Sequence, residues 1–440
     1  MFSTKWLKAF VLVALVMSSL GVVAAQEDPL ADVDPTGQTV VWWHNHSGSR
    51  EEKLAELIAA FNETNEWGIT VEAINQGSYD DIRDKMNAAI QSGELPSLVV
   101  GYQNDQAFYQ QAEALVDLNI YVNSPKWGLT EEEVADFYPT FWAQDVHPEY
   151  GGQRLGFPPN RSAALMYYNV DWLKELGYDA PPTTWAAFKE VSCAATDADA
   201  GTFGVSWYDS ASNFATMVMG LGSNIIAEDG SAYTFDTPEV REALTVLQEL
   251  AAAGCLTQNP ERFGNQADFG NYKALFTFGS SSGLPFYEQA VSEGAQGPFE
   301  WSVAPLPFAE GGEAVLDVYG GSISMPVTTA EQQLAAWLFL KWFTSAENQA
   351  EWVKISGYFP TRASTVEYIQ DYLTENPHFA VAYELLSTTK LVYEPQVISY
   401  QAVRDLMDEA VARAIQGDDI ETIVADLQAG ADEAVAEFAE

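Results

Sequence analysis

Residues 279–283 read Gly-Ser-Ser-Ser-Gly, which matches the G-x-S-x-G pattern of a hydrolase nucleophile elbow. They stand between a predicted strand and a predicted helix, which is the setting of such an elbow. In a secreted serine esterase, Ser281 would be the nucleophile, His378 the base, and Asp317 the acid that orients the histidine. Alternatively, the small residues allow backbone N–H groups at a helix start to face a bound anion or hydroxyl group. We expect this second role, and no catalysis.

His44 and His46 are two residues apart at the end of a predicted strand, so their side chains can point the same way. A metal site would also need cysteine or acidic ligands at suitable spacing, and we predict neither a metal nor another cofactor. Trp42 and Trp43 precede the histidines. One tryptophan should face the core, while the other lines a cleft at the carboxyl end of the strand.

The chain is strongly acidic, with 63 acidic and 20 basic residues and a formal net charge of -43. Nucleic acids and anionic membranes are therefore excluded as partners, because they bind clusters of Lys and Arg. Arg161 and Arg404 stand out among the few cations. For each, a surface ion pair and a ligand contact are both open.

The N-terminus has the composition of a secretory signal peptide. Lys5 and Lys8 precede an apolar run over residues 9–23, and small residues lead up to Gln26. We predict cleavage after Ala25, with an uncleaved anchor as the alternative. No cysteine lies near this position to carry a lipid. A periplasmic or extracellular monomer is expected, with a flexible segment over residues 26–37.

The chain of 440 residues is longer than a domain with a single hydrophobic core usually is, so two lobes are expected. Cys193 and Cys255 form an even pair, which fits either one disulfide or two buried thiols.

Hydrophobic periodicity predicts alternating strands and helices, and therefore an α/β protein with a parallel sheet. A capping box at Ser49 and a start near Ser78 predict the first two helices. Thr237 and Pro238 open a third helix. The predicted strands are 39–43, 69–73, 97–101, 203–207, 274–278 and 301–304, and two helices, 399–416 and 420–439, end the chain.

Six short motifs resemble those of the family 1 extracellular solute-binding proteins of ABC importers, most closely the branch that binds glycerol-3-phosphate. They are VVWWH (40–44), GSYD (77–80), LMYYN (165–169), YGGS (319–322), SAEN (345–348) and GYFP (357–360). The resemblance implies a two-lobed periplasmic binding protein fold, type II-like, with the ligand cleft between the lobes. Residues 38–160 and 304–360 would form lobe 1, and residues 161–303 and 361–440 lobe 2.

The resemblance also implies the ligand-binding residues. Arg404 takes the place of the phosphate-binding arginine, and Gln103 stands where the glycerol-phosphate branch has a glutamate. The full predicted set is Trp43, His44, Tyr79, Gln103, Ser162, Trp207, Ser280, Gly321, Tyr358 and Arg404. The expected ligand is glycerol-3-phosphate or a glycerophosphodiester, delivered to importer permease subunits. A neutral mono- or oligosaccharide is the alternative.

Overall fold

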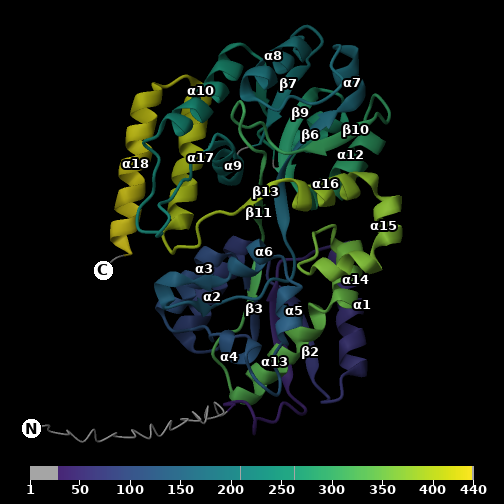
Figure 1. Ribbon diagram of the computed structural model, residues 1–440, viewed down its shortest axis with the longest axis vertical. Helices are drawn as coiled ribbons and strands as arrows, with labels where there is room; N and C mark the ends of the chain where they lie inside the picture. Colours follow the sequence, from purple (N-terminus) through teal and green to yellow (C-terminus); the bar gives the residue numbers. More distant parts are fainter. Residues whose placement is uncertain (1–27, 209, 262, 439–440) are drawn as a thin grey trace, which may run out of the picture.

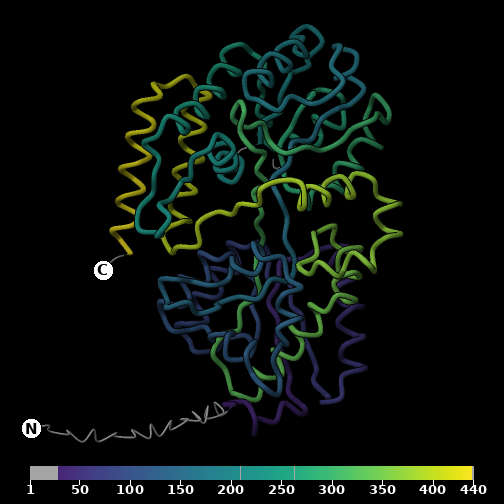
Figure 2. Tube along the Cα trace, in the orientation of Figure 1, coloured from purple at the N-terminus to yellow at the C-terminus, as the bar shows by residue number. Residues whose placement is uncertain are grey.

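The computed structural model describes residues 28–208, 210–261 and 263–438, which form two lobes, one above the other in Figure 1. The predicted signal peptide lies outside the described residues. Lobe 1, at the bottom, combines the N-terminal part of the chain with a later segment that includes α13 and α14, whereas lobe 2 contains the C-terminal helices (Figure 2). The predicted two-lobed α/β fold is confirmed.

Lobe 1 is built on a four-stranded sheet in the order β12-β3-β1-β2. β1 is parallel to β2 and β3, as predicted, and β12 is antiparallel at the edge. Val40 and Trp42 alternate with less buried neighbours, because successive side chains of a strand point to opposite faces. The strands are β1 (Thr39–His44), β2 (Thr70–Asn75), β3 (Leu98–Gly101) and β12 (Ser322–Ser324).

Helices cover both faces of this sheet: α1 and α13 pack with Trp42 on one face, and α2 on the other. The capping box predicted at Ser49 is wrong, because α1 begins at that residue and Gly48, at a φ of 60°, is the N-cap. Ser78 caps α2 through a capping box with Asp81. The helices are α1 (Ser49–Thr64), α2 (Tyr79–Ser92), α3 (Gln103–Gln111), α4 (Asn119–Val122), α5 (Glu131–Ala135), α6 (Pro139–Ala143), α13 (Ala330–Phe343) and α14 (Ala346–Ser356).

Lobe 2 contains a mixed sheet in the order β13-β11-β6-β9-β7-β8, with β10 also paired to β6. β7 is parallel to β8 and β9, whereas β6 is antiparallel to β9, β10 and β11. The strands are β6 (Ser162–Asn169), β7 (Phe203–Trp207), β8 (Leu256–Gln258), β9 (Ala274–Ser280), β10 (Trp301–Ala304), β11 (Val315–Tyr319) and β13 (Lys390–Val392). A small hairpin, β4 (Val146–His147) and β5 (Gln153–Arg154), precedes β6.

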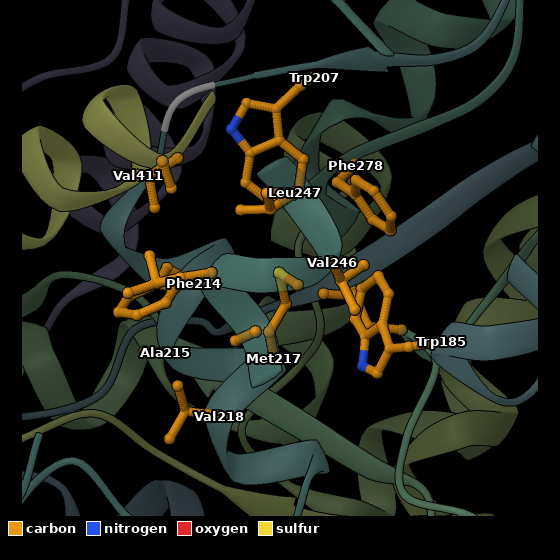
Figure 3. Close-up of a cluster of buried hydrophobic side chains, with 14 of the residues drawn as sticks. Trp185, Trp207, Phe214, Ala215, Met217, Val218, Val246, Leu247, Phe278 and Val411 are labelled. Atoms are coloured by element: carbon orange, nitrogen blue, oxygen red, sulfur yellow. The ribbon is translucent and has the colours of Figure 1, made fainter. Parts of the chain in front are cut away.

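The helices of lobe 2 enclose one large apolar core. Figure 3 shows part of it, where Trp207 and Phe278 pack beside Trp185 and Phe214. Thr237 caps α10 with Pro238 in its first turn, as predicted. The helices are α7 (Val170–Glu175), α8 (Trp185–Ala195), α9 (Ala211–Gly220), α10 (Pro238–Ala252), α11 (Gly264–Gly270), α12 (Leu284–Glu293), α15 (Gln370–Glu375), α16 (Pro377–Thr388), α17 (Tyr400–Gln416) and α18 (Ile420–Glu437), with a 3-10 turn at Ser281–Gly283. Two further 3-10 turns pack on lobe 1: Pro148–Tyr150 against α3, and Ala363–Tyr368 against α14.

The chain enters lobe 2 at β6, returns to lobe 1 between β11 and β12, and crosses again before β13. The return differs from the boundary expected at residue 304. Tyr319 still pairs with Ser162 in the second sheet, whereas Ser322 already pairs with Gly101 in the first. The sequence of β11 does not indicate which sheet the strand joins, because this is determined by its pairing with β6, which is distant in the sequence.

The segment predicted to be flexible packs against lobe 1 from Asp28 onward. Leu30 is buried, and its carbonyl accepts a hydrogen bond from the Trp127 indole at 3.0 Å. Ser124 donates to the Asp28 carboxylate at 2.7 Å. These contacts give the segment a fixed place that its polar composition did not indicate.

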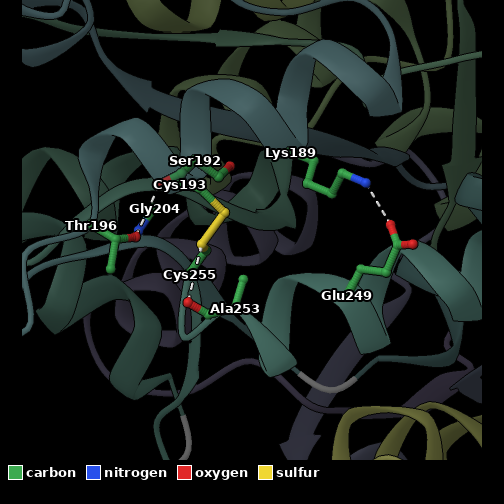
Figure 4. Close-up of a disulfide and its surroundings, with 8 residues drawn as sticks. All are labelled: Lys189, Ser192, Cys193, Thr196, Gly204, Glu249, Ala253 and Cys255. Carbon is green, nitrogen blue, oxygen red and sulfur yellow. Dashed lines mark hydrogen bonds and ion pairs between the residues drawn. A yellow bond between two sulfur atoms is a disulfide. The ribbon is translucent and has the colours of Figure 1, made fainter.

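Cys193 and Cys255 form a disulfide that links the last turn of α8 to the residue before β8 (Figure 4). Of the two alternatives from the sequence, the structure has the bonded one. Between residues 28 and 438, gaps aside, no helix is long and apolar enough to cross a membrane.

Candidate ligand-binding site

A cavity of about 250 Å³ lies between the two lobes. Lobe 1 contributes the starts of α2 and α3, and lobe 2 contributes the end of β11, the segment after β13 and the first turns of α17. The lining residues are Tyr79, Asp80, Arg83, Tyr102, Gln103, Asn104, Gln144, Val318, Tyr319, Tyr393, Glu394, Pro395, Gln396, Tyr400, Gln401, Arg404, Asp405 and Asp408. The cavity thus lies beyond the carboxyl ends of parallel strands, where open α/β sheets bind ligands.

Tyr79 and Tyr102 form the aromatic wall of lobe 1, with ring centroids 4.6 Å apart. The Tyr79 hydroxyl is hydrogen-bonded to Asn45 and to the backbone of Gly321, and burial raises its pKa well above the usual value. A Cβ atom at position 321 would lie 2.8 Å from the Tyr79 ring. Glycine at position 321 therefore allows the ring to approach the backbone where the chain returns to lobe 1.

Arg404 supplies a cation to the opposite wall. Its guanidinium contacts the Glu394 carboxylate at 2.5 Å and donates to Ser212 at 3.1 Å. Tyr400 donates its hydroxyl proton to the same carboxylate. The arginine predicted to hold the ligand therefore already has an anionic partner within the protein.

Asp317 lies behind this pair and is fully buried at the centre of β11. Thr216 donates to its Oδ2 at 3.1 Å, while Oδ1 has no hydrogen-bond partner among the described residues. Burial raises the pKa of Asp317 well above its usual range, and the charge of Glu394 adds to this effect. Burial therefore disfavours the charged form of this carboxyl group.

Gln103 lines the cavity, but its side-chain amide N–H groups point toward the segments where the chain passes between the lobes. They donate to Asp145 at 3.1 Å, to Ser322 at 3.2 Å and to the Gly320 carbonyl at 3.3 Å. Only the amide oxygen is left to serve a ligand, as an acceptor. This is the role that a glutamate would have had, without its charge.

Arg161 belongs to the same buried network and has a structural role. Its guanidinium pairs with Asp145 at 3.0 Å, and neither side chain is exposed. It also donates to Ser322 at 3.0 Å. Of the two roles left open for Arg161, the structure therefore favours an ion pair, although a buried one.

The predicted residues divide into three groups. Tyr79, Gln103 and Arg404 line the cavity. Ser280, Gly321 and Tyr358 contact or influence lining residues: Ser280 is hydrogen-bonded to Tyr319, Gly321 contacts Tyr79, and the phenol of Tyr358 contributes to the raised pKa values of Tyr79 and Tyr102.

The remaining four, Trp43, His44, Ser162 and Trp207, do not line the cavity. Trp207 is 1% exposed and packs edge-on against Phe278 in the lobe 2 core (Figure 3). His44 is equally buried beside Trp42 and His46. Trp43 packs on the α2 side of the first sheet. Ser162 is buried within the second sheet.

The residues of the alternative esterase do not form a catalytic triad. The Ser281 hydroxyl is buried and accepts a hydrogen bond from the Ala163 N–H at 3.0 Å. His378 uses Nδ1 with Glu288 and Nε2 with the Trp301 carbonyl. Neither ring nitrogen is therefore placed to accept a proton from Ser281. No group of three or more His, Cys, Asp or Glu suited to a metal occurs in the described part of the chain.

Sequence reasoning missed Tyr102, Tyr319, Glu394 and Tyr400. Tyr102, Glu394 and Tyr400 stand outside the six motifs, and Tyr319 opens the YGGS motif without a signal of its own. Their roles come from the side chains that they meet in the folded cavity. Of these four, Glu394 could most readily have been found from the sequence, because it stands ten positions before the predicted phosphate-binding Arg404.

A larger, shallower groove of about 910 Å³ lies on lobe 1, lined by residues that include Trp67, Trp127 and Trp342. Its cations are already engaged: Lys341 donates to the Gly128 carbonyl at 2.6 Å, and Lys126 to the Ala31 carbonyl at 2.8 Å. No residue of lobe 2 that could close over a ligand lines this groove. The interlobe cavity is therefore the better candidate site.

Comparisons with known proteins agree with this fold. The sequence model of the bacterial extracellular solute-binding proteins matches residues 56–381. The sn-glycerol-3-phosphate-binding periplasmic protein UgpB of Rhizobium meliloti is 25% identical over 341 residues, covering 74% of this chain and 76% of the relative.

Two solved structures have the same fold. The sugar-binding protein MalE of Xanthomonas citri has a TM-score of 0.77 at 20% identity, covering 91% of this chain and 98% of the neighbour. UgpB of Mycobacterium tuberculosis, in complex with glycerophosphocholine, has a TM-score of 0.76 at 19% identity, covering 91% and 99%. Because the family match spans most of the chain and the two-lobed architecture agrees, this chain belongs to the bacterial extracellular solute-binding protein family.

Proposed function

We propose that the chain captures a glycerophosphodiester in the cavity between its lobes and delivers it to the permease subunits of an ABC importer. The observation that carries this proposal is the position of Arg404 in the cavity wall, opposite Tyr79 and Tyr102 of lobe 1. A guanidinium can hold two phosphate oxygens with charge-assisted hydrogen bonds. The glycerol-3-phosphate-binding relatives, at about 25% identity, support the same ligand class.

The charge of the lining favours a diester over glycerol-3-phosphate itself. Four carboxylates (Asp80, Glu394, Asp405, Asp408) and two guanidinium groups (Arg83, Arg404) face the cavity. A phosphodiester brings one negative charge, whereas a phosphomonoester brings nearly two at neutral pH. The monoester would therefore meet more repulsion from the acidic wall.

The decisive residue is Arg404. Arg404→Ala should weaken binding of sn-glycero-3-phosphocholine by about 10- to 100-fold, because charge-assisted hydrogen bonds contribute about 1.5–3 kcal/mol. Binding of a neutral sugar should change only a few-fold. Calorimetric titration measures both affinities. Arg413→Ala is the matched control, since Arg413 lies on the same helix and pairs with Asp418 and Asp426 outside the cavity.

A neutral oligosaccharide is the second candidate. Glu394 already neutralises Arg404, and the tyrosines of the wall offer faces on which a sugar ring can stack. Titration with glycerophosphocholine, sn-glycerol-3-phosphate, maltose and xylo-oligosaccharides separates the candidates. If only a neutral sugar releases heat, the phosphodiester proposal is wrong, and equal losses for both ligand classes in Arg404→Ala would contradict it as well.

A further inference from the structure

Glu394 already pairs with Arg404, the guanidinium that an anionic ligand in this cavity would contact. It lies in the segment after β13 that lines the cavity together with Tyr393, Pro395 and Gln396. Its side chain is 9% exposed, against 28% for Arg404. The carboxylate is therefore the inner partner of the pair, and it already satisfies the guanidinium that a phosphate would seek.

Glu394 is the carboxylate that both Tyr400 and Arg404 contact. Burial raises the pKa of the neighbouring Asp317 of β11 well above the usual range. Tyr400 donates its hydroxyl proton to Glu394. Arg404 is the one cation that contacts this carboxylate among the described residues. The other groups around the pair are Asp408 of α17, Tyr319 of β11, Ser212 and Thr216 of α9, and Tyr102 at the start of α3.

We propose that Glu394 determines specificity in this site by competing with the ligand's phosphate for Arg404 and by taking up one proton when a phosphodiester binds. This inference rests on the proposed function. A phosphate beside Glu394 takes over its cation and adds a negative charge, and both changes favour the protonated carboxyl group. The proton comes from the solvent to a Glu394 carboxylate oxygen, while Arg404 and the phosphodiester keep their charges.

This exchange discriminates between phosphate classes by charge balance. With Glu394 protonated, Arg404 is left without its internal anionic partner, and its one positive charge pairs with the single negative charge of a phosphodiester. A phosphomonoester would leave about one further negative charge without a partner in a partly buried site. The wild-type protein should therefore prefer the diester, and its affinity should fall as pH rises, by up to about tenfold per pH unit.

Calorimetric titration with sn-glycero-3-phosphocholine at about pH 6, in two buffers of different ionisation enthalpy, measures the protons exchanged on binding. We expect an uptake near one proton for the wild type and near zero for Glu394→Gln, which keeps the shape of the side chain but cannot ionise. Glu394→Asp keeps a carboxylate and should still take up a proton. Glu409→Gln is the matched control, because it removes a carboxylate from an exposed position of the same helix that bears Arg404.

A second titration tests specificity with sn-glycerol-3-phosphate. Glu394→Gln should bind it more tightly than the wild type, because the internal competitor is gone. The inference is overturned if the wild type binds glycerophosphocholine without proton uptake, if Glu394→Gln takes up as many protons as the wild type, or if this variant gains no affinity for the monoester. Failure of the wild type to bind glycerophosphocholine would instead refute the proposed function, and the inference with it.

Discussion

At the scale of single residues, Asp317 is an ionisable side chain in a position that disfavours its charged form. It is a fully buried carboxyl group with one oxygen that has no hydrogen-bond partner among the described residues. Burial raises its pKa in the folded state well above 3.8, while the unfolded chain keeps the ordinary value. The folded state therefore binds this proton more tightly. Its contribution to stability is present below about pH 4 and is lost as pH rises toward the folded pKa.

Asp317→Asn should therefore gain stability relative to the wild type as pH rises. The amide cannot ionise, and its oxygen can still accept the hydrogen bond from Thr216. We expect the difference in melting temperature between variant and wild type to be more favourable to the variant at about pH 8 than at about pH 5. Thermal unfolding followed by circular dichroism measures it, with exposed Asp371→Asn as the control. Equal differences at both pH values would contradict the role given to burial.

The same residue scale explains which parts of the site were predictable. Tyr79, Gln103 and Arg404 were predictable because the resemblance assigned each of them to a ligand-binding position, and all three line the cavity. Glu394 could not be assigned in this way, because its importance comes from the Arg404 guanidinium. Trp207 was predicted to bind the ligand, yet its ring fills the lobe 2 core. A sequence does not say which side of a strand end an aromatic ring will face.

At the scale of elements, local signals predicted several boundaries correctly, although the capping box expected at Ser49 was wrong. β10 and the start of α10 have the predicted bounds. β11 was not predicted as a strand of the second sheet, since β6, its partner, is far away in the sequence. Pairings of this kind depend on tertiary contacts rather than on propensity.

The disulfide between Cys193 and Cys255 is the covalent link at this scale, and it closes a loop of 62 residues that includes β7, α9 and α10. Loop closure on this scale lowers the entropy of the unfolded chain and should stabilise lobe 2 by about 4 kcal/mol. Reductant should therefore lower the urea midpoint of unfolding. The double variant Cys193→Ala, Cys255→Ala should have the lower urea midpoint, and reductant should not change it. An unchanged wild-type midpoint would mean that the link adds no stability.

At the scale of the whole molecule, a side-chain hydrogen bond joins helices of opposite lobes across the cavity. Arg83 of α2 donates to the Gln401 side chain of α17 at 3.3 Å, while Asp105 at 2.5 Å holds the guanidinium in place. Binding proteins of two lobes close around a ligand by hinge motion. A hydrogen bond across the cleft favours the closed form even without ligand, whereas the net charge of -43 favours separation of the lobes.

Gln401→Ala should shift the ligand-free protein toward an open form. A single hydrogen bond contributes about 0.5–1.5 kcal/mol, so the population of the closed form should fall about 2- to 12-fold. Small-angle X-ray scattering should then give a larger radius of gyration for the ligand-free variant than for the wild type. Gln248→Ala is the control, because Gln248 donates to the Asp418 carbonyl within lobe 2.

Ligand should remove this difference, because contacts in the cavity add to the closed state and outweigh one lost hydrogen bond. The radius of gyration at saturating glycerophosphocholine should therefore be the same for Gln401→Ala and the wild type, while the affinity of the variant falls by no more than the shift in closure allows. Equal radii of gyration for the ligand-free variant and wild type would mean that the Arg83–Gln401 hydrogen bond does not stabilise the closed form. Closure would then depend on the ligand and on the buried ion pair of Asp145 and Arg161 near the segments that connect the lobes.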